Sequence, residues 1–237
     1  MDFARSGSVG KRVKIEVHFT EMDTINFKPW IGENYGTTGF KGKKILVLGE
    51  SHYCKEELSE GGRCFPSCTK AKMRVACHNE TINCISDFVE THKNFKQYRN
   101  FEKTIYGRAL TDEESAEFWN GIVFYNYVQY SVGNAPRVCV PEKYWEKSEE
   151  AFKEVLEKFM PDYILIWGVS RLWQNLPNWG GRESQVEIDG ERLKVWIYTI
   201  NGKEIPAMAC YHPSTKDGSD YEYWHPFYKK FLNLPQL

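Results

Sequence analysis

The chain has 237 residues, of which 41% are hydrophobic, and its formal net charge is −1. This length favours one sizeable hydrophobic core, and no apolar run approaches the roughly 20 residues that a membrane-spanning helix needs. A near-neutral charge without a basic tail is not that of a strong non-specific DNA-binding protein.

The most informative stretch is KILVLGESHY, residues 44–53. Its four apolar residues stop at Gly49, an order that is typical of a short strand buried on both faces. The residues that follow carry polar or aromatic groups: Glu50, Ser51, His52 and Tyr53. Because open α/β sheets hold ligands beyond the carboxyl ends of their strands, we expect these side chains at the ligand-binding edge of a sheet.

Helices are predicted along the rest of the chain, after a Gly- and Cys-rich loop at residues 57–68. Thr111 and Glu114 have the spacing of a capping box, and Pro141 stands where the first turn of a long helix tolerates proline. The segments with helical periodicity or end signals are residues 79–95, 111–120, 141–160, a short helix soon after residue 168, and residues 219–232.

Buried strands alternate with these helices. Short apolar runs predict them at residues 122–125, 163–167 and 207–210. The first of these runs ends in Asn126, and the last is followed by Tyr211 and His212. A hairpin around an Asp-Gly turn, residues 185–199, is expected as an insertion before the last strand.

Strands that alternate with helices predict a three-layer α/β/α fold with a four-stranded parallel core sheet. We expect one domain over the whole chain, with its core at about residues 43–237 and an N-terminal extension at residues 1–42. Because the carboxyl ends of parallel strands share one edge, we expect Glu50, Asn126 and His212 to face one pocket.

Four segments, in order along the chain, resemble motifs of the uracil-DNA glycosylase superfamily. GESHY at residues 49–53 stands where members carry GQDPYH, GINPG or GEAPG, and YHPST at residues 211–215 stands at the second motif, HPS. NGIVFYNYVQ, residues 120–129, is similar to the strand that delivers a base-reading asparagine, and GGRCF, residues 61–65, to the GRPF segment of the GEAPG branch. The resemblance covers residues 43–215. It implies that fold and hydrolysis of the N-glycosidic bond of uracil or a deaminated base in DNA.

The resemblance also implies roles for the motif residues. The expected catalytic residues are Glu50, which would orient water or stabilise a sugar cation, Ser51, and His212, which would hydrogen-bond the base carbonyl. Asn126 would read the Watson–Crick edge of the flipped base. The other expected substrate-binding residues are Gly49, His52, Tyr53, Phe65 and Ser214.

Several of these positions have a defined place in the superfamily motifs. Phe65 would stack on the base, and Tyr53 stands where the GQDPYH branch has the tyrosine that excludes a 5-methyl group. Ser51 occupies the place of the water-activating aspartate, and His52 that of the proline common to the motifs. The loop at residues 215–220 contains two acidic residues and no leucine, whereas members usually present an apolar or basic residue to the duplex.

Cysteines crowd the segment after the first motif, at Cys54, Cys64, Cys68, Cys77 and Cys84. Since cysteine thiolates bind zinc or iron–sulfur clusters, the first four are candidate metal ligands, and free thiols are the alternative. The iron–sulfur ligands of the GEAPG branch partly precede the first strand, where this chain has no cysteine, so that cluster is not implied. The base chemistry itself requires no cofactor. With an odd number of cysteines, seven, and no secretory segment, we expect a soluble cytoplasmic protein with reduced thiols.

Two other functions use the same residues. A non-catalytic module would keep the pocket to bind a base or nucleotide. An N-glycosidase acting on small-molecule nucleosides would suit the near-neutral charge and the acidic loop. The expected partner is therefore DNA, including single-stranded DNA, or a nucleoside-like small molecule, and no membrane is expected.

Overall fold

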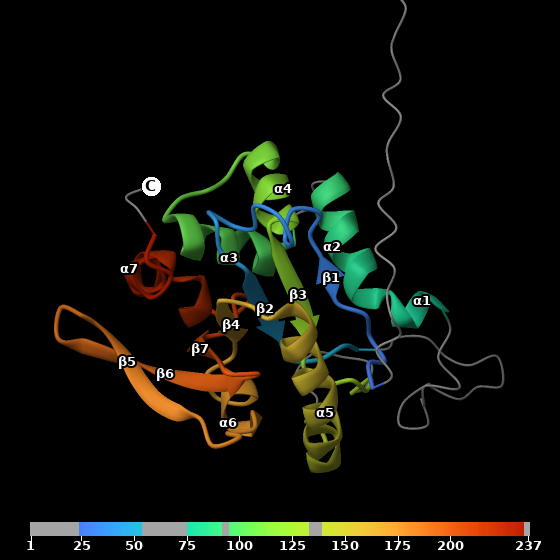
Figure 1. Cartoon of the computed structure of the whole chain (residues 1–237). Helices are drawn as coiled ribbons and strands as arrows, with labels where there is room; N and C mark the ends of the chain where they lie inside the picture. The colour runs from blue at the N-terminus through green and yellow to red at the C-terminus, as the bar shows by residue number, and fades with distance from the viewer. Residues whose placement is uncertain (1–23, 54–74, 92–94, 133–138, 235–237) are drawn as a thin grey trace, which may run out of the picture.

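Short apolar strands form the centre of the sheet, as the sequence predicts. The computed structural model describes residues 24–53, 75–91, 95–132 and 139–234. The central strands run parallel in the order β3-β2-β4-β7 (Figure 1). They are β2 (Ile45–Gly49), β3 (Ile122–Asn126), β4 (Tyr163–Trp167) and β7 (Lys203–Cys210). Because side chains alternate along a strand, these runs present apolar groups to both faces of the sheet.

Antiparallel strands extend this centre at both edges. β1 (Trp30–Ile31) pairs with β3, and a hairpin of β5 (Arg182–Ile188) and β6 (Glu191–Ile200) pairs with β7. The sheet therefore has seven strands over the described residues and is mixed, so the expected four-stranded parallel core does not describe the whole sheet, because parallel strands form only its centre. The hairpin, expected as an insertion, belongs to the sheet. Its turn places Asp189 and Gly190 at φ 51° and 84°, the left-handed pair that matches strand twist.

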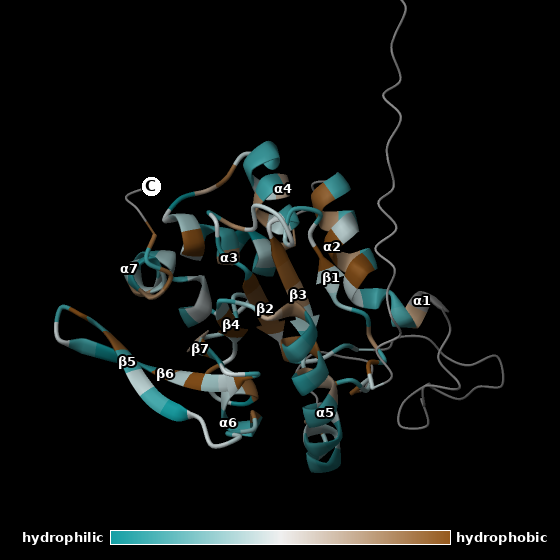
Figure 2. Cartoon of the chain, in the orientation of Figure 1, coloured by the Kyte–Doolittle hydropathy of each residue, from teal (hydrophilic) through white to brown (hydrophobic). Residues whose placement is uncertain are grey.

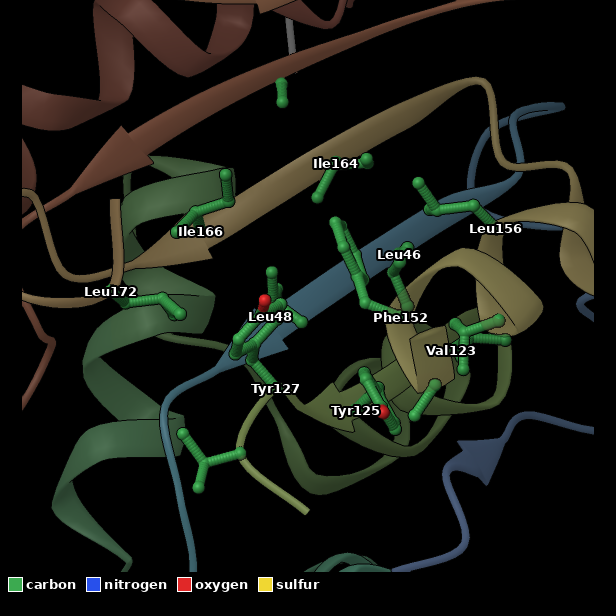
Figure 3. Close-up of a cluster of buried hydrophobic side chains, with 14 of the residues drawn as sticks. Leu46, Leu48, Val123, Tyr125, Tyr127, Phe152, Leu156, Ile164, Ile166 and Leu172 are labelled. Atoms are coloured by element: carbon green, nitrogen blue, oxygen red, sulfur yellow. The ribbon is translucent and has the colours of Figure 1, made fainter. Parts of the chain in front are cut away.

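Helices cover both faces of the sheet. They are α1 (Val75–His78), α2 (Glu80–Thr91), α3 (Lys96–Tyr106), α4 (Asp112–Asn120), α5 (Glu142–Phe159), α6 (Leu172–Asn175) and α7 (Tyr221–Phe231). Leu46 and Leu48 pack in one buried cluster with Phe152 of α5 (Figure 3). Ile45 and Val47, on the opposite face of β2, pack in a second cluster with residues of α2, α3, α4 and α7. In Figure 2 strands β2 and β3 are mostly brown, whereas α5 is mostly teal.

The helix ends follow local signals. The capping box of α4 is confirmed, because Thr111 Oγ1 accepts from the Glu114 N–H and the Glu114 carboxylate accepts from the Thr111 N–H. Pro141 is the residue before the first turn of α5. The helix expected at residues 79–95 ends at Thr91, and α3 was not predicted. No helix in the described ranges is long and apolar enough to cross a membrane.

Residues 24–42, which we expected to be an extension, take part in the packing of the sheet. They contain β1, and the side chains of Ile25, Phe27, Tyr35 and Phe40 are buried. This segment therefore contributes to the same two hydrophobic clusters as the strands.

Candidate functional site

A cleft of about 520 Å³ lies beyond the carboxyl ends of β2, β3, β4 and β7. The predicted site residues that line it are Gly49, Glu50, Ser51, His52, Tyr53, Asn126, His212 and Ser214. Parallel pairing brings these residues together, because it places the strand ends at one edge. The predicted stacking residue Phe65 lies outside the described residues.

Gly49 and Asn126 end neighbouring strands and face each other in the register of β2 and β3. The Asn126 side chain is buried, and its Oδ1 atom would lie 2.3 Å from a Cβ at position 49. A glycine therefore leaves the room that the asparagine amide needs at this strand end. The backbone pairing continues past the strands, since the N–H groups of Tyr127 and Val128 donate to the carbonyl oxygens of Gly49 and Glu50, each at 2.9 Å.

His52 contacts the same asparagine from the other side. Its Nε2 atom lies 3.0 Å from Asn126 Nδ2 and 2.7 Å from Thr81 Oγ1, and its ring packs 4.6 Å from that of Phe27. Burial lowers the pKa of His52 from 6.5 to about 4, so the ring is neutral near neutral pH. Because an amide nitrogen can only donate, an Asn126 Nδ2 atom that faces Nε2 corresponds to the tautomer in which Nε2 is unprotonated and accepts. A buried neutral histidine thus fixes the direction of the amide.

Glu50 forms an ion pair at the cleft. Its Oε1 atom accepts from Arg171 Nη2 at 2.7 Å, and the carboxylate side chain is 17% exposed. Burial raises the pKa of Glu50, and the guanidinium of Arg171 opposes that rise. Arg171 was not predicted as a site residue, although a cation just beyond the end of a predicted strand is a signal that could have identified it. The arrangement presents a carboxylate that a cation helps to keep ionised.

His212 is half-buried and is oriented by its own loop. The backbone N–H of Ser214 donates to His212 Nδ1 at 3.2 Å, and Ser214 Oγ lies 2.8 Å from the same atom. Because Nδ1 accepts a hydrogen bond, the neutral ring carries its proton on Nε2. Burial lowers the pKa of His212, which favours that neutral form. The ring packs edge-to-face on Trp167, with centroids 5.7 Å apart.

The loop after His212 is held by close backbone contacts. The His212 carbonyl accepts from the N–H of Thr215 at 2.9 Å, and a Cβ at Gly218 would lie 2.1 Å from that carbonyl oxygen. The buried Asn100 side chain donates to the Pro213 carbonyl at 2.8 Å. Asn100 and Gly218 therefore help to place His212, and no local sequence pattern indicated either of them.

Two buried polar atoms belong to residues of the cleft wall. Ser51 Oγ and Trp167 Nε1 have no hydrogen-bond partner among the described residues. Such atoms are costly to bury unpaired, and both residues line the cleft, so a bound ligand or water can supply the missing partners. Ser51 is a hydroxyl and cannot act as a carboxylate base. Besides Arg171, the wall residues that were not predicted are Thr81, Cys84, Gln97, Tyr98, Phe124, Trp167, Gly168, Val169, Ser170, Tyr211 and Thr215.

The cysteines give limited support for a metal site. Cys54, Cys64 and Cys68 lie outside the described residues, while Cys77 and Cys84 are free thiols. Burial and the neighbouring Glu80 carboxylate raise the pKa of Cys84 to about 12, which disfavours the thiolate that a metal binds. The described part of the chain contains no group of three His, Cys, Asp or Glu residues that could hold a metal ion.

Comparison of the chain with protein-family models gives no match, and comparison with curated proteins gives none either. Inference about function therefore depends on the chemistry of the cleft.

Proposed function

We propose that the protein is a uracil-DNA glycosylase-like enzyme that hydrolyses the N-glycosidic bond of uracil or another deaminated base in DNA. The observation that carries the proposal is the convergence of Glu50, Asn126 and His212 on one cleft from the ends of three parallel strands. Strands β3, β2, β4 and β7 would then correspond to the parallel core of that superfamily, with β1 and the β5–β6 hairpin as additions at its edges.

The reaction separates charge in a way that suits His212. The bond between the sugar C1′ and the base nitrogen breaks, the oxygen of water bonds to C1′, and the base takes up a proton. Negative charge develops on the base carbonyl oxygen as the bond breaks. A neutral His212 with its proton on Nε2 can donate to that oxygen, because Nδ1 is occupied by the Ser214 N–H.

Glu50 suits the opposite charge. An oxocarbenium-like sugar is stabilised by a nearby carboxylate, and a carboxylate can also orient the attacking water. Arg171 binds Oε1 of Glu50, and the carboxylate lines the cleft, where it can face the sugar or the water. Asn126, whose amide is fixed in direction, would read the edge of the base.

The loop after His212 favours a second candidate, an N-glycosidase acting on nucleosides. Thr215 lines the cleft, and the exposed Asp217 and Asp220 follow it closely. Asp220 accepts from the backbone N–H of Tyr223 at the start of α7, which keeps a carboxylate at this end of the loop. Carboxylates in this loop would repel DNA phosphates and would not repel an uncharged nucleoside.

Cleavage assays on two substrates test the proposal. The protein is incubated with single-stranded DNA containing one uracil and, separately, with deoxyuridine; abasic sites are scored by alkaline cleavage and free uracil by chromatography. We expect abasic sites in the DNA, and a loss of about 100-fold or more in rate for His212→Asn and for Glu50→Gln. Glu117→Gln, on the exposed face of α4, is the matched control and should retain the wild-type rate.

The outcomes separate the candidates. Release of uracil from deoxyuridine alone would identify the nucleoside N-glycosidase. Binding of uracil without cleavage of either substrate would identify a non-catalytic module. Equal rates for the wild type and for His212→Asn would contradict the assignment of the site.

A further inference from the structure

We propose that His52 is a positioning residue that orients the Asn126 amide, so that the cleft selects ligands with an N–H donor at the edge facing Asn126. The inference deepens the function proposed above and depends on it for the class of ligand, a nucleobase. The orientation itself depends only on the contacts between His52, Asn126 and Thr81.

The first step is the hydrogen bond between the two side chains. Asn126 Nδ2 lies 3.0 Å from His52 Nε2, which is a normal distance for an N–H donor and a ring-nitrogen acceptor. An amide can be turned by 180° with little change of shape, so its direction is set by its partners. In the tautomer that carries its proton on Nδ1, the neutral His52 ring offers Nε2 only as an acceptor, and this tautomer selects the orientation in which the NH₂ group faces His52.

The second step is the enclosure of the ring nitrogen. Thr81, a buried residue of α2, places its hydroxyl oxygen 2.7 Å from the same Nε2 atom. Phe27 packs against the ring, with centroids 4.6 Å apart. His52 is 9% exposed, so water competes little for its Nε2 atom. Together with Asn126, these contacts hold the imidazole in place from three segments of the chain.

The third step is what the amide then presents to a ligand. With Nδ2 turned to His52, the Oδ1 atom lies against Gly49, and both of these residues line the cleft. An amide oxygen can only accept. A base whose ring nitrogen bears a proton, such as uracil, can donate to it, whereas cytosine offers an acceptor at that ring position and would leave two acceptors facing each other.

Nuclear magnetic resonance of the wild-type protein tests the orientation without any ligand. Nitrogen-15 shifts of the His52 ring should show an unprotonated Nε2 and a protonated Nδ1 near neutral pH. A protonated Nε2 would turn the amide the other way and would overturn the inference, whatever the protein does to nucleic acids.

Binding measurements test the selectivity. Dissociation constants for free uracil and free cytosine are compared for the wild type, His52→Phe and Thr81→Val, with thermal unfolding to check that each variant is folded. We expect the wild type to prefer uracil, and His52→Phe to reduce that preference by about 3- to 10-fold, the range for one hydrogen bond. Thr81→Val retains the acceptor nitrogen and should reduce the preference less, which keeps the test valid if His52→Phe fails to fold.

The two proposals fail in different ways. An unchanged preference for uracil in His52→Phe would overturn the role of His52 and leave the glycosylase-like function standing. A wild type that cleaves neither substrate and binds neither base would contradict the proposed function and, with it, the selectivity, while the tautomer measurement would still report the orientation.

Discussion

Two groups of side chains in the cleft are held in different ways. The recognition group, His52, Asn126 and Thr81, is buried and linked by hydrogen bonds between neutral atoms. The reactive group, Glu50, Arg171 and His212, borders the solvent and contains an ion pair. The geometry of the first group is therefore set by folding, and the protonation of the second responds more directly to the solution. The difference predicts that acid and mutation affect the two groups separately.

The largest expected effect is that of acid on the recognition group, where protonation of His52 should lower the free energy of unfolding. The pKa of His52 in the folded protein is about 4, below its ordinary 6.5, so the unfolded chain takes up the proton first. Stability is then present above pH 6.5 and is lost as the pH falls from 6.5 toward 4. The two pKa values correspond to a loss on the order of 3 kcal/mol, measured as the free energy of unfolding in urea across this pH range.

The His52→Phe variant serves as the control for this measurement, because every other titrating group remains. Its free energy of unfolding should depend less steeply on pH between 6.5 and 4 than that of the wild type. Parallel pH profiles for the two proteins would show that the imidazole is not buried in its neutral form.

The next largest effect is expected from displacing His212 of the reactive group, which should lower kcat. In Gly218→Ala the new Cβ would lie 2.1 Å from the His212 carbonyl oxygen, so the loop must move. A shift of about 1 Å at a catalytic group can cost about 100-fold in rate, and we expect a fall of that size in kcat for base release. Gly36→Ala is the control, since a Cβ there meets nothing within 4 Å. Equal losses of kcat in both variants would rule out displacement of His212 as the cause.

Removing the cation of the reactive group should have a smaller effect. In Arg171→Gln the guanidinium no longer opposes the burial that raises the pKa of Glu50, so the carboxylate is ionised only at higher pH. We expect kcat/KM to fall by about tenfold at acidic pH, and the acidic limb of the profile of kcat/KM against pH to move to higher pH. A lower rate with an unshifted limb would mean that Arg171 acts without changing the ionisation of Glu50.

The smallest effect is expected from an ion pair outside the cleft, which gives a reference for the pair of Arg171 and Glu50 inside it. Arg182 and Glu204 pair at 3.0 Å with side chains 59% and 58% exposed. Exposed pairs contribute less than about 1 kcal/mol, so Arg182→Gln should leave base release unchanged and lower the free energy of unfolding by about 0.5 kcal/mol. A larger loss, measured by urea unfolding, would show that this hairpin supports the sheet more than its exposure suggests.

The parts of the fold that the sequence predicts are those that local patterns encode. The central strands are short apolar runs because both of their faces are covered, and the capping box of α4 is complete within four residues. The juxtaposition of Glu50, Asn126 and His212 follows from parallel strands alone. The last strand begins at Lys203 and not at Ala207 as expected; the Asn201-Gly202 pair, at φ 49° and 79°, carries the same hairpin signal as Asp189-Gly190 and could have indicated this earlier start.

Other features depend on contacts that no local pattern contains. β1 has two residues and is a strand only because it pairs with β3, far along the chain. Thr81 reaches the cleft from a helix, and Arg171 reaches it through the loop after β4. The role of His52 in holding Asn126 could not be predicted, because it depends on the ends of β2 and β3 lying side by side. Phe65 and three of the candidate metal ligands remain predictions from the sequence.

The backbone pairing that continues beyond β2 and β3 has a consequence for hydrogen exchange. The amide protons of Tyr127 and Val128 belong to the ladder of the central strands although they lie beside the cleft. Protons in such a ladder exchange when the strands separate, which requires opening of the most stable part of the fold. Asn126, which directly precedes these two residues, therefore belongs to the same cooperative unit as the sheet.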